Sequence, residues 1–287
     1  MRTAPFEYHR AHDIDDALEW LTREEEREVK ILAGGHSLLP LMKLKLATPG
    51  VLLDVQGVFA LRGVSLEPGW VRIGALTRYV DLMRDRIVLE SLPLLAQASG
   101  TVADLQVRNR GTIGGSLCHA DPAADMPAAV LALEGRLVIL GPRGERRVGL
   151  EEFVVAPFLT ILEPHEILVA IEFPMPEAPQ KSVYLKRPHP ASGYPVVGVA
   201  ITGAATPHPA SAALKVAVTG IGNRAYRAHA VEEILNRHEP KLETLREAAA
   251  VASTEADFGD DKDLTYRLQL TRIYMERALF QFYGRES

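Results

Sequence analysis

Two glycine pairs carry the strongest chemical signal in the chain. The first lies in Ala33-Gly34-Gly35-His36-Ser37 and the second in Thr112-Ile113-Gly114-Gly115-Ser116. Glycine lacks a Cβ, so its backbone can turn tightly and approach a ligand closely. Successive free N–H groups in such a loop form a concave site that favours an anion such as a diphosphate. One pair alone is typical of an ordinary turn, but two similarly built pairs predict a single large anionic ligand held from both sides.

Composition and charge limit the class of protein. The chain has 287 residues, of which 47% are hydrophobic and 24% charged, as in an ordinary globular protein of about two domains. The net charge of −5 and the lack of a basic block argue against a nucleic-acid partner. No apolar run reaches about 18 residues and no apolar signal core opens the chain, so we expect a cytoplasmic protein without a membrane span. The single cysteine, Cys118, excludes an all-cysteine metal cluster on this chain, so redox chemistry would need a bound cofactor or a redox centre on another chain.

Periodicity places the first glycine pair between a strand and a helix. Asp13 has the residue type of an N-cap for a helix over 14–21, and Ser37 is expected to cap a helix running to residue 46. Three apolar runs have the length of short strands: 6–8, 29–33 and 51–55. This order predicts a compact β-α-β-loop-α-β unit.

The region around the second glycine pair is predicted to form hairpins and short helices. Thr77 and Ser91 have the side chains that start helices, and residues 127–133 have a helical apolar face. Five segments are predicted as strands: 61–66, 70–75, 136–140, 145–148 and 167–173.

The proline-rich stretch Pro174–Gln180 is predicted to be a linker that separates the last part of the chain from the rest. Proline has no N–H to donate to a neighbouring strand and restricts the residue before it, so regular structure is disfavoured there. Strands are predicted after it, followed by helices: 182–186, 196–204 and 213–219, then 229–237, 242–252 and 264–283. Strands first and helices later indicate a separate α+β domain.

At the two glycine pairs the sequence resembles a known family. Residues 33–43 resemble the first FAD loop of the medium, flavin-binding subunit of bacterial molybdenum hydroxylases, the family of the carbon monoxide dehydrogenase flavoprotein subunit and the FAD domain of xanthine dehydrogenase. Residues 108–125 resemble its second loop at nearly every position. The likeness extends over essentially the whole chain and includes 73–77, 166–168 and 266–267.

The resemblance implies an α+β fold in three parts. Residues 1–58 and 59–175 would be the two subdomains of a PCMH or vanillyl-alcohol-oxidase-like FAD-binding domain. Residues 181–287 would form a C-terminal antiparallel sheet with helices, like that of the carbon monoxide dehydrogenase flavoprotein.

The resemblance also implies a role in electron transfer. Electrons would come from a molybdenum cofactor on a large partner subunit through [2Fe-2S] clusters on a small iron–sulfur subunit. They would leave through FAD to an external acceptor such as NAD⁺, a quinone, a ferredoxin or oxygen. A chain with one cysteine cannot hold a Cys₄ cluster, which agrees with carriers on other polypeptides. Two alternatives stay open: a stand-alone FAD-dependent oxidoreductase, and a scaffold that has lost its flavin.

The site residues follow from the same resemblance, and none of them acts as an acid or base on an organic substrate. The two glycine segments would bind the diphosphate side of FAD, and Val102 would pack on the cofactor. The implied cofactor-binding residues are Leu32, Ala33, Gly34, Gly35, His36, Ser37, Leu38, Val102, Thr112, Ile113, Gly114, Gly115, Ser116, Asp125, Leu168 and Lys186.

Three of these residues have specific implied roles, each with an ordinary alternative. Asp125 would accept hydrogen bonds from the ribityl hydroxyls, or it could cap the helix that begins near Pro127. Leu168 would shield the isoalloxazine ring, or it is plain strand core. Lys186 would place a cation near the N1/C2=O edge and so stabilise the negative charge of reduced flavin, or it is a solvated lysine at a strand end.

Two positions depart from the usual pattern. Relatives often carry Gln where this chain has His36, and in other flavoproteins of the superfamily a His beside Gly-Gly is bonded covalently to the flavin. We predict non-covalent FAD with His36 as a hydrogen-bonding residue. After Lys186, relatives often continue with Arg and then Ser-Gly-Asp-aromatic, whereas residues 187–194 here contain two prolines and no Asp. The role of that loop is open, and Tyr194 at its end is a candidate to close over the flavin ring.

Overall fold

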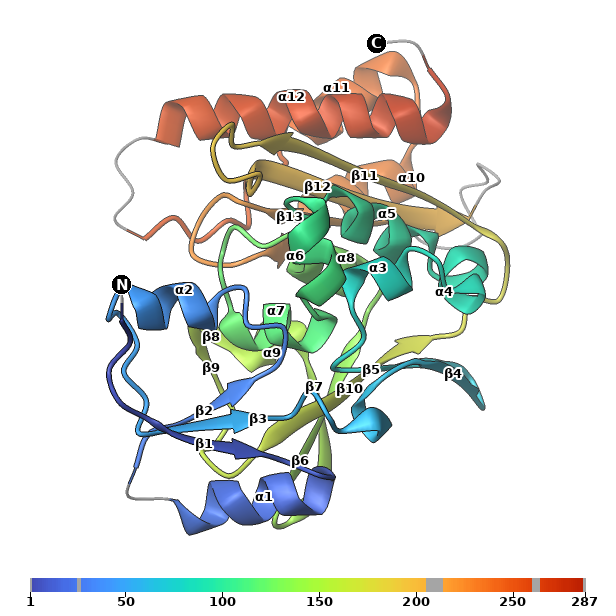
Figure 1. The fold of residues 1–287 in the computed structure, drawn as a ribbon. Helices are drawn as coiled ribbons and strands as arrows, with labels where there is room; N and C mark the ends of the chain where they lie inside the picture. Colours follow the sequence, from blue (N-terminus) through green and yellow to red (C-terminus); the bar gives the residue numbers. More distant parts are fainter. Residues whose placement is uncertain (1, 25–26, 205–213, 260–263, 286–287) are drawn as a thin grey trace.

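The structure is a computed structural model that describes residues 2–24, 27–204, 214–259 and 264–285. Within these residues the strands form four sheets, which Figure 1 shows stacked between α1 at one end and α12 at the other. The mixed helix and sheet content confirms the predicted α+β class.

The first sheet is parallel and has the order β1-β3-β2. Its strands are β1 (Glu7–Arg10), β2 (Val29–Leu32) and β3 (Val51–Asp54), and its helices are α1 (Ile14–Arg23) and α2 (Leu38–Lys43). β3 is buried along its length because it lies between the other two strands. Asp13 caps α1 as predicted, since its carboxylate accepts from the N–H of Asp16 at 2.8 Å. The first glycine pair follows β2 and leads into α2.

The second sheet is antiparallel and has the order β4-β5-β10-β6-β7. Its strands are β4 (Val64–Glu67), β5 (Trp70–Gly74), β6 (Arg136–Gly141), β7 (Gly144–Gly149) and β10 (Ile167–Pro174). The two predicted hairpins are confirmed, β4 with β5 and β6 with β7. A small two-stranded sheet, β8 (Val154–Ala156) with β9 (Leu159–Thr160), lies beside α7.

Short helices fill the connections of this region. They are η1 (Phe59–Leu61), α3 (Tyr79–Leu82), α4 (Arg86–Ser91), α5 (Pro93–Thr101), α6 (Leu105–Arg110), α7 (Ile113–His119), α8 (Met126–Ala132) and α9 (Leu150–Phe153). Two predicted caps are wrong. The Thr77 hydroxyl bonds to the backbone of Gly63 instead of capping α3, and Ser91 is the last residue of α4, while α5 starts at Pro93.

The third sheet has the order β11-β12-β13-β14, all antiparallel. Its strands are β11 (Gln180–Pro188), β12 (Pro195–Ala204), β13 (Lys215–Thr219) and β14 (Tyr226–Arg227), and the helices are α10 (His229–Arg237), α11 (Leu242–Ala250) and α12 (Leu264–Tyr283). The predicted strands and helices are confirmed here, and residue 213 of the third strand lies outside the described residues. α12 covers one face of this sheet, and α5 and α8 pack on the other (Figure 1).

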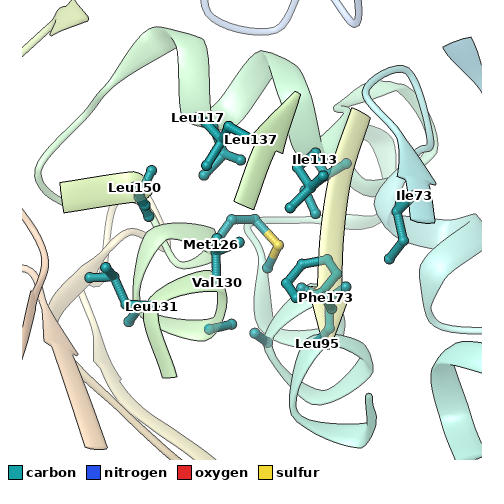
Figure 2. Packing of buried hydrophobic residues seen from close by; sticks show 14 of the residues in the cluster. Ile73, Leu95, Ile113, Leu117, Met126, Val130, Leu131, Leu137, Leu150 and Phe173 are labelled. Atoms are coloured by element: carbon teal, nitrogen blue, oxygen red, sulfur yellow. The ribbon is translucent and has the colours of Figure 1, made fainter. Parts of the chain in front are cut away.

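A buried apolar cluster fixes α7 and α8 against the second sheet. Figure 2 shows Met126 of α8 close to Ile113 and Leu117 of α7, with Phe173 of β10 beside them. Tyr184 of the third sheet belongs to the same cluster, so the second and third sheets share a core. The division of the chain into domains at 58/59 and 175–181 stays a prediction.

Candidate functional site

The first glycine segment presents unbonded backbone N–H groups. Within the described part of the chain, the N–H groups of residues 34–37 donate to no acceptor. Gly35 has φ +77°, a left-handed conformation that favours glycine. The His36 ring bonds back to the carbonyl of Gly34 at 3.0 Å. Four successive free N–H groups give this segment the donor set that an anion such as a diphosphate requires.

Ser37 occupies the N-cap position of α2 but makes no capping hydrogen bond there, so its predicted capping role is wrong. Its backbone is helical rather than extended, with φ −100° and ψ −51°, which differs from the usual N-cap conformation. The Ser37 hydroxyl instead interacts with the Tyr194 side chain. Leu32 and Leu38 pack with Met42 under α2, so they would contribute to a ligand site through their backbone.

The second glycine segment is the first turn of α7, not a free loop. Thr112 is its N-cap and accepts from the N–H of Gly115 at 3.1 Å. The N–H groups of Ile113 and Gly114 donate to the carbonyls of Thr77 and Ala75, at 3.0 and 2.9 Å. The expectation of successive free N–H groups is therefore wrong for this segment, because backbone carbonyls at the end of β5 take two of them.

The glycines of this segment serve close packing. A Cβ on Gly114 would lie 2.5 Å from the Cβ of Ala75, so Gly114 lets α7 approach the end of β5. The Ile113 side chain is fully buried in the core cluster. Gly115 and Ser116 are half-buried and remain on the accessible side of the turn.

The two glycine segments nevertheless lie against each other. A Cβ on Gly34 would lie 2.4 Å from the carbonyl oxygen of Arg110 and 2.9 Å from the Cα of Gly111. A Cβ on Gly115 would lie 3.8 Å from the Cβ of Ala33. The free N–H groups of the first segment and the accessible side of the α7 turn therefore belong to one region of the molecule.

A buried polar cluster is formed by Asp125, Lys186 and Tyr184. The Lys186 ammonium lies 2.9 Å from Oδ1 and 3.0 Å from Oδ2 of Asp125, and the Tyr184 hydroxyl donates to Oδ1 at 2.7 Å. The side chains of Lys186 and Asp125 are 7% and 5% exposed. Burial raises the pKa of Asp125, and the adjacent Lys186 and Tyr184 oppose that rise.

The geometry of this cluster excludes the ordinary alternative roles that the sequence left open for Lys186 and Asp125. Lys186 is not a solvated strand-end lysine, because it is buried and paired. Asp125 lies at the N-cap position of α8 but makes no capping hydrogen bond, so the capping alternative is wrong. Lys186 also donates to the carbonyl of Gly193 at 2.9 Å, which ties the loop between β11 and β12 to the cluster.

Two further predicted site residues, Leu168 and Val102, differ in how far they are buried. Leu168 is 5% exposed and pairs with Ile139 inside the second sheet, so its side chain is strand core in this structure. Val102 ends α5 and is half-buried, and its carbonyl accepts from the Arg108 guanidinium at 2.7 Å. In the next residue, Ala103, the backbone lies against Gly193 of the β11–β12 loop.

One site residue, Tyr184, was not among the sequence predictions. Tyr184 precedes Lys186 by two positions on β11, and alternate residues of a strand share a face, so this spacing could have indicated it. Tyr194 reaches Ser37 from the end of the β11–β12 loop, a contact that no local pattern predicts. Through Tyr194 the third sheet reaches the first glycine segment.

The thiol of Cys118 on α7 is expected to be unreactive. Burial raises its pKa to about 12, and only the thiolate is an effective nucleophile. At pH 8 the folded protein should resist iodoacetamide, whereas the chain unfolded in urea should be alkylated rapidly. Intact-protein mass spectrometry measures the difference, and fast alkylation of the folded protein would contradict the raised pKa of this half-buried thiol.

Comparisons with known proteins identify the family. Residues 4–176 match the family model described as FAD binding domain in molybdopterin dehydrogenase. The chain is 34% identical over 276 residues to the carbon monoxide dehydrogenase medium chain of Hydrogenophaga pseudoflava, covering 96% of both. It is 32% identical over 275 residues to the glyceraldehyde dehydrogenase medium chain of Sulfolobus acidocaldarius, covering 95% of this chain and 96% of that one.

Solved structures agree with the sequence relatives. Carbon monoxide dehydrogenase from Hydrogenophaga pseudoflava, lacking the Mo-pyranopterin moiety, matches with a TM-score of 0.91 and 34% identity over 100% of both chains. Quinoline 2-oxidoreductase from Pseudomonas putida 86 matches with a TM-score of 0.90 and 27% identity over 99% of both.

The chain therefore belongs to the family of FAD-binding domains of molybdopterin dehydrogenases. It is an FAD-binding medium subunit of an oxidoreductase of the molybdenum hydroxylase type. Among the described residues, no helix is long and apolar enough to cross a bilayer.

Proposed function

We propose that this chain binds FAD non-covalently between the first glycine segment, the start of α7 and the cluster of Asp125, Lys186 and Tyr184. The single observation that carries the proposal is the set of four free N–H groups at residues 34–37, held against the second glycine segment. The donor set fits a diphosphate, and the buried Lys186 fits a group that becomes negative on reduction.

Each part of the site has a separate task. The N–H groups of residues 34–37 bind the diphosphate, and Gly115 and Ser116 line its other side. Asp125 would accept hydrogen bonds from the ribityl hydroxyls, and the Lys186 ammonium would stabilise negative charge on the reduced ring. FAD supplies the one- and two-electron chemistry, and the protein supplies position and electrostatics.

The chain would act in electron transfer between partners. A small subunit with [2Fe-2S] clusters would deliver electrons that originate at a molybdenum cofactor on a large subunit, and an external acceptor would receive them. The relatives include medium chains of carbon monoxide and glyceraldehyde dehydrogenases, which supports this assignment.

Affinity purification of the tagged chain from its native host tests the assignment. We expect FAD on this chain, molybdenum and iron on co-purifying subunits, and bleaching of the flavin when the organic substrate of the complex is added without oxygen. A chain that purifies alone and oxidises a substrate by itself would favour the stand-alone alternative.

Non-covalent attachment has its own test. The His36 ring is exposed and bonded to Gly34, and we expect it to stay unmodified. After precipitation with trichloroacetic acid, all of the yellow colour should remain in the supernatant. Flavin that stays with the pellet, with a matching mass increase on the peptide containing His36, would contradict the proposal.

A further inference from the structure

Tyr184 has a hydroxyl that no part of the proposed flavin chemistry requires. The side chain is buried, at 7% exposure, and its hydroxyl donates to Oδ1 of Asp125 at 2.7 Å. That same carboxylate also holds the Lys186 ammonium. One buried carboxylate is thus shared between a neutral donor and a cation.

The surrounding residues hold this hydroxyl in place. The backbone N–H of Tyr184 donates to Oε1 of Gln97 at 2.9 Å, which joins β11 to α5. A Cβ on Gly198 would lie 2.8 Å from the Tyr184 hydroxyl and 2.9 Å from Cγ2 of Thr219. Gly198 is the β12 residue opposite Lys186, so a glycine at this position leaves the space that the hydroxyl occupies.

We propose that Tyr184 is a positioning residue that keeps the positive charge of Lys186 available to the flavin and thereby raises the reduction potential of FAD. The inference rests on the proposed FAD site. The Tyr184 hydroxyl donates a hydrogen bond to the Asp125 carboxylate, so the carboxylate interacts less strongly with the Lys186 ammonium.

The sign of the effect follows from electrostatics in a buried site. Without the hydroxyl, the carboxylate pairs more tightly with Lys186 and neutralises more of its charge. The O–H dipole, whose positive end points to Asp125, is lost as well. Both changes make the local potential more negative, and interactions between charges are strong where water is excluded. Reduced flavin, which carries the added negative charge, is then less stable relative to oxidised flavin.

Two substitutions in the full-length chain test the inference independently. Tyr184→Phe removes the hydroxyl and keeps the ring, whereas Gly198→Ala keeps the hydroxyl but takes its space. Dye-equilibrated anaerobic titration, followed at 450 nm, gives the midpoint potential of bound FAD. In both variants we expect the ratio of reduced to oxidised flavin at a fixed potential to fall about tenfold, which is a shift of about −30 mV for a two-electron couple.

Tyr226→Phe is the matched control, because it removes another buried tyrosine hydroxyl of the same sheet, one that donates to the carbonyl of Ala252 at 2.8 Å. It should lower the melting temperature about as much as Tyr184→Phe and leave the potential unchanged. A wild-type potential in FAD-loaded Tyr184→Phe or Gly198→Ala would overturn the inference. Failure of the wild-type chain to bind FAD would instead overturn the proposed function, so the two failures are distinguishable.

Discussion

Replacing Gly34 with alanine is expected to weaken FAD binding by about 100-fold while most of the fold stays intact. The new Cβ would lie 2.4 Å from the carbonyl oxygen of Arg110 and 2.9 Å from both the Arg110 carbonyl carbon and the Gly111 Cα. All three are backbone atoms, so no side chain can rotate away to relieve the contact. The first glycine segment must move away from the Arg110–Gly111 backbone, which leads into the second segment, and overpacking of this kind costs about 1–3 kcal/mol of stability.

Fluorescence titration with FAD measures the affinity, and urea unfolding measures the stability. Gly149→Ala is the matched control, since a Cβ there would have no atom within 4 Å and its φ of −72° suits any residue. That variant should bind FAD as the wild type does. Wild-type affinity in Gly34→Ala would mean that the contact between the segments does not matter for binding.

Replacing Lys186 with methionine is expected to destabilise the fold by about 3–5 kcal/mol and to lower the flavin potential. Methionine keeps the length and the apolar stem but leaves the Asp125 carboxylate buried without its cation. Both side chains are less than a tenth exposed, so solvent does not screen the pair. Adding Asp125→Asn to this variant removes the uncompensated charge and should restore part of the lost stability.

The pH dependence of this variant has a definite sign. Burial already raises the pKa of Asp125, and removal of Lys186 raises it further. At pH values between the pKa of Asp125 in the unfolded chain and its higher pKa in the folded variant, the folded state binds more protons than the unfolded state. The free energy of unfolding of the variant therefore falls as pH rises. Urea unfolding should therefore show a smaller deficit, relative to wild type, at pH 5.5 than at pH 7.5. A deficit that is independent of pH would show that Asp125 is not the destabilising group.

Local signals in the sequence predicted much of the fold. Asp13 caps α1 through a bond to a residue three positions away, and the hairpins at Pro68-Gly69 and Pro142-Arg143 form between neighbouring segments. Helices α4 and α6 were missed, although Asp85 and Asp104 cap them by equally local bonds. These two helices span six residues each, too few for a periodic apolar pattern to stand out.

The site was harder to predict because its partners are distant in sequence. The second glycine segment was expected to be a loop, but the carbonyls of Ala75 and Thr77 bind its N–H groups and make it a helix start. Asp125 and Lys186 were singled out by resemblance, whereas their mutual ion pair depends on the packing of α8 against the third sheet. No local pattern encodes such a contact.

Amide hydrogen exchange at single-residue resolution is the most direct test of the central claim, that the first glycine segment binds the FAD diphosphate through its backbone. Without FAD, the N–H groups of residues 34–37 should exchange rapidly, since they have no acceptor in the described structure. With FAD they should become protected, while Ile113 and Gly114, already bonded to Thr77 and Ala75, should change little. Protection that appears elsewhere and leaves residues 34–37 unaffected would contradict the claim.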